Sequence, residues 1–161
     1  MRRLREGEGA RIRELRLRAL REAPEAFSSS LEREAQGPAE AWDDLAAQSE
    51  RADVSVVFIA VEDGEWVGMA GGYLKRSPRA AGLWGMWVAP EARRRGLGRR
   101  LVEAAADWAQ DRGAARLDLS VTDRAEAASS LYQRLGFAPT GEQRPLPSDA
   151  SVTEVFMSRD L

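Results

Sequence analysis

The sequence of 161 residues contains no cysteine and no histidine. Without cysteine there is no disulfide, no thiolate nucleophile and no iron–sulfur or zinc–thiolate site. Without histidine there is no Ser-His-Asp triad, no imidazole base and no histidine-ligated metal, so we expect no metal site. Any chemistry must come from carboxylates, hydroxyls, backbone amides and arginine, or from a cofactor that brings its own reactive group.

Other absences narrow the class of protein. No apolar run reaches the roughly 18 residues of a membrane-spanning helix, and residues 1–9 have no apolar core of signal-peptide length. With no cysteine to mark the redox compartment, a cytoplasmic location is the default expectation. The 24 basic and 26 acidic residues nearly cancel, and a pI near 5.4 is a poor profile for a general nucleic-acid binder. The composition predicts a soluble globular protein.

Hydrophobic periodicity predicts one α/β domain over residues 1–161. Helical spacing covers residues 10–22 and, more weakly, residues 39–48, where Trp42 and Leu45 share a face. β-branched and apolar runs predict strands at 54–61, 66–74 and 81–88, with an Asp-Gly turn after the first and a Ser77-Pro78 turn after the second. The glycines of the second strand indicate a bulge or a close backbone approach.

The second half of the chain continues this alternation of helix and strand. In order, we expect a long helix ending at Gly113, a strand at 116–121, a helix at 125–135 with Ala128, Leu131 and Leu135 inward, a short strand near Ala138, a proline-rich loop holding Pro145 and Pro147, and a last strand at 152–157. No repeat or linker divides the chain.

The segment from Met86 to Leu101 carries the clearest functional signal. Pro90 stops a strand, and Arg93-x-x-Gly96-x-Gly98 then opens a helix. The first amides of a helix are unpaired, and the positive end of its dipole faces outward. Glycines allow close approach, and five arginines, at 93, 94, 95, 99 and 100, add positive charge. This arrangement favours binding of a pyrophosphate.

Two other nucleotide-binding motifs are excluded for this segment, and two further interpretations stay open. A Rossmann fingerprint would need glycine where Leu101 stands, and a P-loop would need a Gly-Lys-Ser/Thr sequence that is absent. The arginines alone would also fit a nucleic-acid patch, and a solvated helix start without a ligand is the plain alternative.

The motifs together resemble the GNAT superfamily of acyl-CoA N-acyltransferases. The resemblance rests on Val88-x-Pro90, on Arg93-x-x-Gly96-x-Gly98 and on Ala128-x-x-Leu131-Tyr132-x-x-x-Gly136-Phe137 further along the chain. It implies an α/β (α+β) single-domain fold: a mixed central sheet of about six to seven strands with a splay between two parallel strands, flanked by about four helices.

The resemblance also implies acetyl-CoA as co-substrate and places it residue by residue. The pantetheine arm would pair with the strand edge at Trp87 and Val88, and the amides of residues 94–99 would hold the pyrophosphate. Ala125 stands where the family often has asparagine, and Asp123 or Ser129 could substitute. The expected cofactor-binding residues are Trp87, Val88, Arg93, Arg94, Arg95, Gly96, Leu97, Gly98, Arg99 and Ser129.

Tyr132 is the expected catalytic residue, since the resemblance places it beside the thioester sulfur. A phenol stays protonated at neutral pH and can donate to a departing thiolate. A core tyrosine on an amphipathic helix is the alternative. The base stays unassigned: Asp118 and Ser120 alternate with apolar residues on the strand after the motif helix, and either could face the cavity or solvent.

These residues predict an N-acetyltransferase that transfers acetyl from acetyl-CoA to a primary amine of a small molecule or peptide. Without cysteine an acyl-cysteine route is impossible, so the amine attacks directly in a ternary complex. The fold would build the acceptor site from Phe27, Ser28 to Ser30, Trp42 and residues 144–149. The alternatives are a catalytically silent acyl-CoA-binding sensor and an RNA-directed protein, including one that acetylates a charged tRNA. Dimerisation through the C-terminal strands is common in proteins of this resemblance, and an exposed edge at residues 152–157 would permit a homodimer.

Overall fold

A seven-stranded mixed sheet with the order β1-β2-β3-β4-β5-β7-β6 organises the chain in the computed structural model. The structure describes residues 1–76, 79–147 and 149–161, so the expected Ser77-Pro78 turn lies outside the described residues. The strands are Arg2–Arg3 (β1), Ser55–Glu62 (β2), Glu65–Leu74 (β3), Ala80–Val88 (β4), Arg116–Thr122 (β5), Ala138–Leu146 (β6) and Asp149–Asp160 (β7). All neighbouring pairs are antiparallel except β4 and β5.

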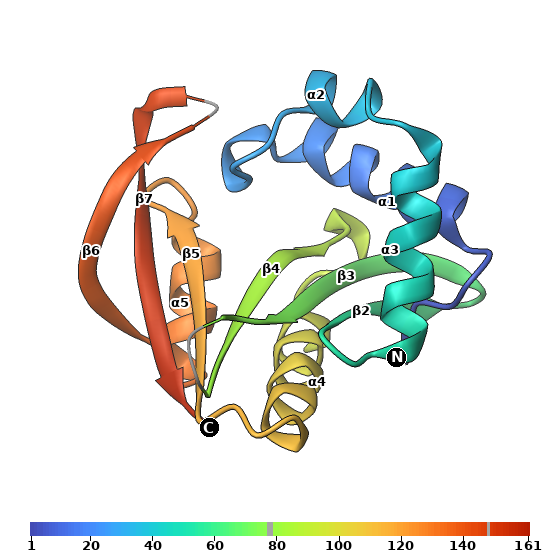
Figure 1. The fold of residues 1–161 in the computed structure, drawn as a ribbon. Helices are drawn as coiled ribbons and strands as arrows, with labels where there is room; N and C mark the ends of the chain where they lie inside the picture. Colours follow the sequence, from blue (N-terminus) through green and yellow to red (C-terminus); the bar gives the residue numbers. More distant parts are fainter. Residues whose placement is uncertain (77–78, 148) are drawn as a thin grey trace.

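Within the described residues, five α-helices and two short 3₁₀ helices cover this sheet. They are Gly9–Glu22 (α1), Pro24–Ala26 (η1), Leu31–Ala35 (α2), Ala39–Arg51 (α3), Pro90–Ala92 (η2), Leu97–Asp111 (α4) and Glu126–Arg134 (α5). In Figure 1, α4 lies on one side of β2, β3 and β4, and α1 and α3 lie on the other. The mixed sheet, the single parallel pair and the flanking helices confirm the expected fold class.

Close packing explains the glycines of β3. A Cβ atom at Gly71 would lie 2.1 Å from the indole of Trp84, and one at Gly72 would lie 3.0 Å from the indole of Trp108. Both distances are shorter than ordinary carbon contacts, so each glycine leaves room for an aromatic ring on its own face of the sheet. Trp108 is buried and donates its indole N–H to the Ala52 carbonyl at 2.9 Å. The expected close backbone approach is therefore confirmed.

The C-terminal segment differs from expectation. In place of a short strand and a proline-rich loop, β6 and β7 form one long hairpin, and Pro145 lies inside β6. A proline is tolerated there because β6 is the edge of the sheet and its outer side has no ladder to donate to. The expected exposed edge at residues 152–157 is wrong, since β7 pairs with β5 on one side and β6 on the other. The short elements β1 and α2 were not anticipated.

Candidate active site

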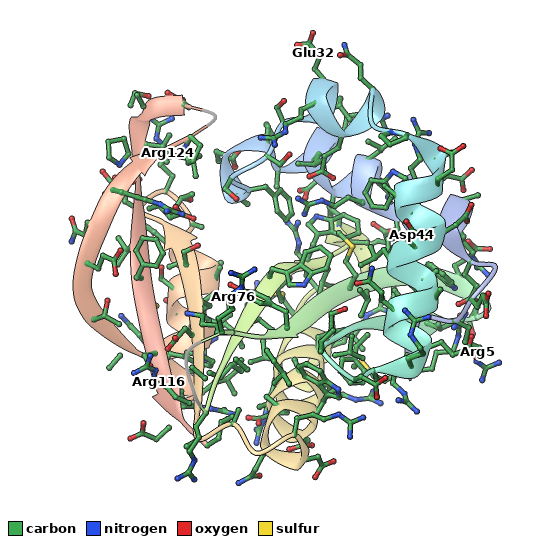
Figure 2. All side chains as sticks on the ribbon, in the orientation of Figure 1. Arg5, Glu32, Asp44, Arg76, Arg116 and Arg124 are labelled. Atoms are coloured by element: carbon green, nitrogen blue, oxygen red, sulfur yellow. The ribbon has the colours of Figure 1, made fainter. Side chains whose placement is uncertain are left out.

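The parallel strands β4 and β5 pair over a short stretch and then separate. Their register couples Ala80 with Arg116, Ala81 with Leu117, and Gly82 with Asp118, and no β5 partner follows for the rest of β4. Figure 1 shows the two strands close at one end and diverging toward the other. In Figure 2 the labelled Arg116 marks the closed end, and Arg124 lies just beyond the open end of β5. The expected splay is present, and this name is used below for the region beyond Gly82.

A bulge shapes the β4 side of the splay. Between the pairs Met69–Trp87 and Gly71–Trp84, β3 advances by two residues and β4 by three. The extra residue falls at Gly85, which has a φ of 62° in the region that favours glycine. The alternation of side chains between the two faces of β4 therefore breaks at this point.

Beyond the bulge, Val88 turns its main chain toward the splay. Val88 lies opposite Gly68, and the N–H of Ala89 donates to the Val67 carbonyl at 2.8 Å. That bond makes Val88–Gly68 a non-hydrogen-bonded pair, so the N–H and C=O of Val88 point away from β3. The same alternation turns the main chain of Trp87 toward β3. Of the two residues expected at this edge, Val88 offers its backbone groups.

The turn between η2 and α4 presents a row of free amides. Arg94 and Gly96 both have left-handed backbone, with φ of 64° and 78°, which folds successive N–H groups into a concave nest. Among the described residues, the N–H groups of residues 94–99 have no acceptor, and the first helical bond runs from Arg100 N–H to the Gly96 carbonyl at 3.1 Å. The bare helix start that the glycine motif predicted is present, and a geometry of this kind suits an anion.

Two of the five arginines of this turn form ion pairs with glutamates, and three do not. Arg93 pairs with Glu22 at 2.6 Å and also donates from Nε to the Val88 carbonyl, and Arg95 pairs with Glu62 at 3.0 Å. Within the described part of the chain, no carboxylate lies within 4.0 Å of the guanidinium groups of Arg94, Arg99 and Arg100. Those three exposed arginines keep their positive charge available for a ligand.

Tyr132 is the buried residue of α5. Its ring packs edge-on against Phe137, with centroids 5.7 Å apart, and no described residue accepts from or donates to its hydroxyl. Burial raises the pKa of the Tyr132 phenol above its ordinary value, so the group holds its proton at neutral pH. The residues expected to point inward, Ala128, Leu131 and Leu135, are only half-buried.

Asp123 and Ser129 are the two residues that could substitute for the asparagine that the family often has at the position of Ala125. The carboxylate of Asp123 accepts from the N–H of Thr153 at 3.3 Å, so it serves the turn after β5. The hydroxyl of Ser129, half-buried on α5, has no partner within the described residues. Ser129 is therefore the better placed of the two to contact a ligand.

Asp118 is a structural ion-pair centre at the closed end of the splay. Its carboxylate accepts from Lys75 at 2.6 Å and Ser158 at 2.8 Å, and it pairs with Arg116 at 2.9 Å. Burial alone would raise the pKa of Asp118, but the bonds from Lys75, Ser158 and Arg116 outweigh it and hold the pKa below its ordinary value. These residues line a cavity of about 340 Å³ together with Leu119, Thr140, Glu142, Phe156 and Met157. Asp118 also lies where β4 and β5 still pair, outside the open part of the splay, so it is poorly placed to act as a general base.

The substitution Asp118→Asn should lower the free energy of unfolding by about 1–2 kcal/mol at pH 7, because it weakens charged hydrogen bonds that are partly screened by solvent. A carboxylate whose folded pKa is lowered stabilises the protein above the unfolded pKa, near pH 4, and this stabilisation is lost as the pH falls through the folded pKa. Urea unfolding of both proteins between pH 3 and 7 should show the difference shrinking at the acid end. The exposed Asp107 supplies the control variant Asp107→Asn, and an equal effect there would contradict this role.

Sequence reasoning missed Glu154, a buried carboxylate that is 3% exposed. It accepts from the Ser120 hydroxyl at 2.5 Å and from Nε of Arg144 at 2.7 Å. Ser120 lies beyond the last pair between β4 and β5, so the two residues form the β5–β7 wall of the splay. Glu154 shares the face of Val152, which stands two residues earlier in the last strand, and this spacing was the available signal. It does not reveal which strand lies beside Glu154.

The segments expected to form the acceptor site lie in different settings. Phe27 is buried against the guanidinium of Arg16 at 4.4 Å, and the Ser30 hydroxyl accepts from the N–H of Arg33 to cap α2. Trp42 is half-buried on α3. Residues 144–146 belong to β6, and residue 148 lies outside the described part of the chain. The 3₁₀ helix η1, which follows α1 directly, contacts β5. The end of α1 therefore lies close to the splay.

No group of three or more acidic side chains is arranged to hold a metal ion within residues 1–76, 79–147 and 149–161. Over the same residues, no helix combines the length and apolar character needed to cross a bilayer.

Comparison with known proteins gives consistent relatives. Over 96 residues the chain is 40% identical to streptothricin acetyltransferase from Streptomyces lavendulae, which covers 59% of this chain and 50% of that protein. Over 75 residues it is 40% identical to L-2,4-diaminobutyric acid acetyltransferase from Chromohalobacter salexigens, covering 46% of this chain and 39% of that protein. A GNAT-family acetyltransferase structure from Streptococcus pneumoniae superposes with a TM-score of 0.85 at 21% identity, covering 99% of this chain and 97% of that one.

The extent of these matches differs between relatives and family. The chain spans about half the length of the streptothricin acetyltransferase and less of the diaminobutyric acid enzyme. The family profile described as Acetyltransferase (GNAT) family matches residues 13–137, which include β4, the amide-rich turn, the splay and Tyr132. The chain belongs to the acetyltransferase (GNAT) family.

Proposed function

We propose that this protein transfers the acetyl group of acetyl-CoA to a primary amine, with both substrates bound together. The observation that carries the proposal is the row of free amides at residues 94–99 at one end of a strand whose edge is unpaired. A pyrophosphate with an extended amide-containing arm matches both features at once. The buried phenol of Tyr132 adds a proton donor that needs no other cofactor.

The residues fit coenzyme A in three parts. The amides of residues 94–99 and the unpaired guanidinium groups of Arg94, Arg99 and Arg100 would hold the phosphates. The N–H of Val88 would pair with a carbonyl of the pantetheine arm, as an added strand pairs with a sheet edge, while the C=O of Val88 already accepts from Nε of Arg93. Ser129 would contact the arm from α5. When bound, acetyl-CoA supplies an acetyl group already activated as a thioester.

The chain's own residues then manage two protons. Most amines are protonated at neutral pH and must lose a proton before they attack. Glu154 is the buried carboxylate on the wall of the splay, and with Ser120 it receives that proton. As the N–C bond forms and the C–S bond breaks, Tyr132 gives its phenolic proton to the departing sulfur. Exchange with solvent restores both groups, leaving an amide and a free thiol.

The acceptor is proposed to be a small molecule or peptide that carries a primary amine. The relatives named above act, by their names, on streptothricin and on L-2,4-diaminobutyric acid, and the second of these is itself a diamine. The shared identity covers 59% and 46% of this chain, so the amine class is carried over and the individual substrate is not.

Thiol release with a panel of amines tests the proposal. We expect thiol to appear only when amine and acetyl-CoA are both present, and double-reciprocal plots at several fixed concentrations of the second substrate should intersect. Parallel lines would contradict a ternary complex. Acetyl-CoA binding without thiol release from any amine would indicate the silent sensor, and RNA binding with a steep salt dependence would indicate the RNA-directed alternative.

A further inference from the structure

Two side-chain polar atoms are buried without a hydrogen-bond partner among the described residues, and both lie beside the splay. They are Nη1 of Arg16, on α1, and Oγ1 of Thr122, at the end of β5. Thr122 follows Ser120 by two residues and so shares its face of the sheet. Buried polar groups nearly always have a partner, and leaving one without costs free energy. For Nη1 of Arg16, a polar ligand would supply the missing partner.

Arg16 is held firmly with one nitrogen to spare. Its Nε and Nη2 donate to the two carboxylate oxygens of Glu34 at 2.9 and 2.8 Å, and its guanidinium lies 4.4 Å from the ring of Phe27. The residue is only 7% exposed. Because Glu34 already balances the charge, what the guanidinium still lacks is an oxygen to accept from Nη1.

That free nitrogen faces the bulge of β4. A Cβ atom built on Gly85 would lie 3.6 Å from Nη1 of Arg16, and no other described heavy atom would lie within 4 Å of it. A side chain at position 85 would therefore touch Nη1, and glycine leaves this donor facing the backbone in the unpaired part of β4. The same strand continues to Val88, the edge proposed above to hold the pantetheine arm.

We infer that Nη1 of Arg16 binds an oxygen of the acceptor substrate, a carboxylate or carbonyl oxygen close to the amine that is acetylated. This inference rests on the proposed function and narrows its substrate class. A simple polyamine offers only donors and leaves Arg16 unsatisfied, whereas an amino acid, amino amide or peptide terminus supplies the missing acceptor.

Binding of three matched probes tests the inference without requiring turnover. The complex of this protein with coenzyme A is titrated calorimetrically with L-2,4-diaminobutyrate, with its carboxamide and with 1,3-diaminopropane, which lacks the carboxyl carbon. We expect the diaminopropane to bind at least about 10-fold more weakly than the tighter of the other two, the effect of one hydrogen bond to a charged group. The carboxamide and the diamine carry the same charge, so a difference between those two reports the carbonyl oxygen itself. Tighter binding of the carboxylate alone would assign the site to the charged oxygen.

Variants connect that preference to Arg16. The double variant Arg16→Gln/Glu34→Gln replaces the ion pair by two amides and avoids a buried lone carboxylate; it should reduce the preference to about 1-fold. Arg13→Gln is the matched control, because Arg13 lies on the same helix and donates to the Ala35 carbonyl of α2 at 2.7 Å. The control should keep the wild-type preference, and both variants should keep the wild-type affinity for coenzyme A.

Three outcomes would overturn the inference: equal affinity for all three probes, no binding of the oxygen-bearing probes, or an unchanged preference in the double variant. Failure of the proposed function would be seen in a different measurement, the release of thiol. If the oxygen-bearing probes bind selectively but no thiol is released from any amine, the subsite stands and the acetyl transfer is wrong. If thiol is released equally from diaminobutyrate and diaminopropane and both bind equally, acetyl transfer stands and the subsite is wrong.

Discussion

Replacing Tyr132 with phenylalanine is expected to lower kcat at least about 100-fold, the usual contribution of a positioned general acid. The affinity for acetyl-CoA should stay within about 2-fold of wild type, because the ring remains and only the proton donor is lost. The fold should also be preserved, since no described residue bonds to the hydroxyl and the packing against Phe137 uses the ring alone. Steady-state thiol release and calorimetric titration with acetyl-CoA measure the two quantities.

The sequence contains one other tyrosine, and it provides the control. Tyr73 is 40% exposed on β3, and its ring stands over Gly82, where the two parallel strands still pair. The variant Tyr73→Phe makes the same chemical change outside the proposed reaction and should leave kcat unchanged. A Tyr132→Phe protein with wild-type kcat would remove Tyr132 from the mechanism and leave it a core residue of α5.

Replacing Gly98 with valine is expected to weaken acetyl-CoA binding about 100-fold. A Cβ atom at this position would lie 3.1 Å from Cδ2 of Leu131 and 4.0 Å from Cγ2 of Val88, so the larger side chain pushes α5 away from α4 and crowds the free amides. Each hydrogen bond from such an amide to a phosphate contributes about 1.5–3 kcal/mol, and a loss of about 1.4 kcal/mol is tenfold in affinity. Calorimetric titration with acetyl-CoA measures the effect.

The matched control for this variant is Gln110→Val. Gln110 is exposed near the other end of α4, so the variant introduces the same β-branched residue far from the amides. The control should bind acetyl-CoA like the wild type. Unchanged affinity in Gly98→Val would mean that the anion binds elsewhere and that the free amides of residues 94–99 face solvent in the working protein.

The elements with strong local patterns were predictable. The strands at residues 54–61 and 81–88 and the helix that opens at the glycine motif agree with β2, β4 and α4 to within a residue or two. The proline-rich segment was not, because a proline normally interrupts a ladder and its acceptance in β6 depends on that strand lying at the edge. The edge position in turn depends on the whole order of the sheet.

In the candidate site, too, the locally determined features were predictable and the contacts between distant residues were not. The helix start with free amides at Gly96 and Gly98 was predictable because a left-handed residue and a bare helix start are local properties of the chain, and its binding of an anion stays a prediction. Asp118, like Ser120, was left open as the base, because its alternation with apolar residues shows which residues share its face and not what that face contacts. That pattern does not reveal that Lys75, Arg116 and Ser158 occupy its oxygens.

By itself the sequence determined the kinds of chemistry open to this protein. The absence of cysteine and histidine, the Arg93-x-x-Gly96-x-Gly98 turn and Tyr132 are properties of residue types and short spacings. Only the tertiary structure decided which distant side chains meet: Glu154 with Ser120, and Arg16 with the bulge at Gly85. The reason is physical, since strand register and helix placement are set by burial over the whole molecule, and a shift of one residue in strand register would turn Glu154 or Ser120 to the opposite face of the sheet.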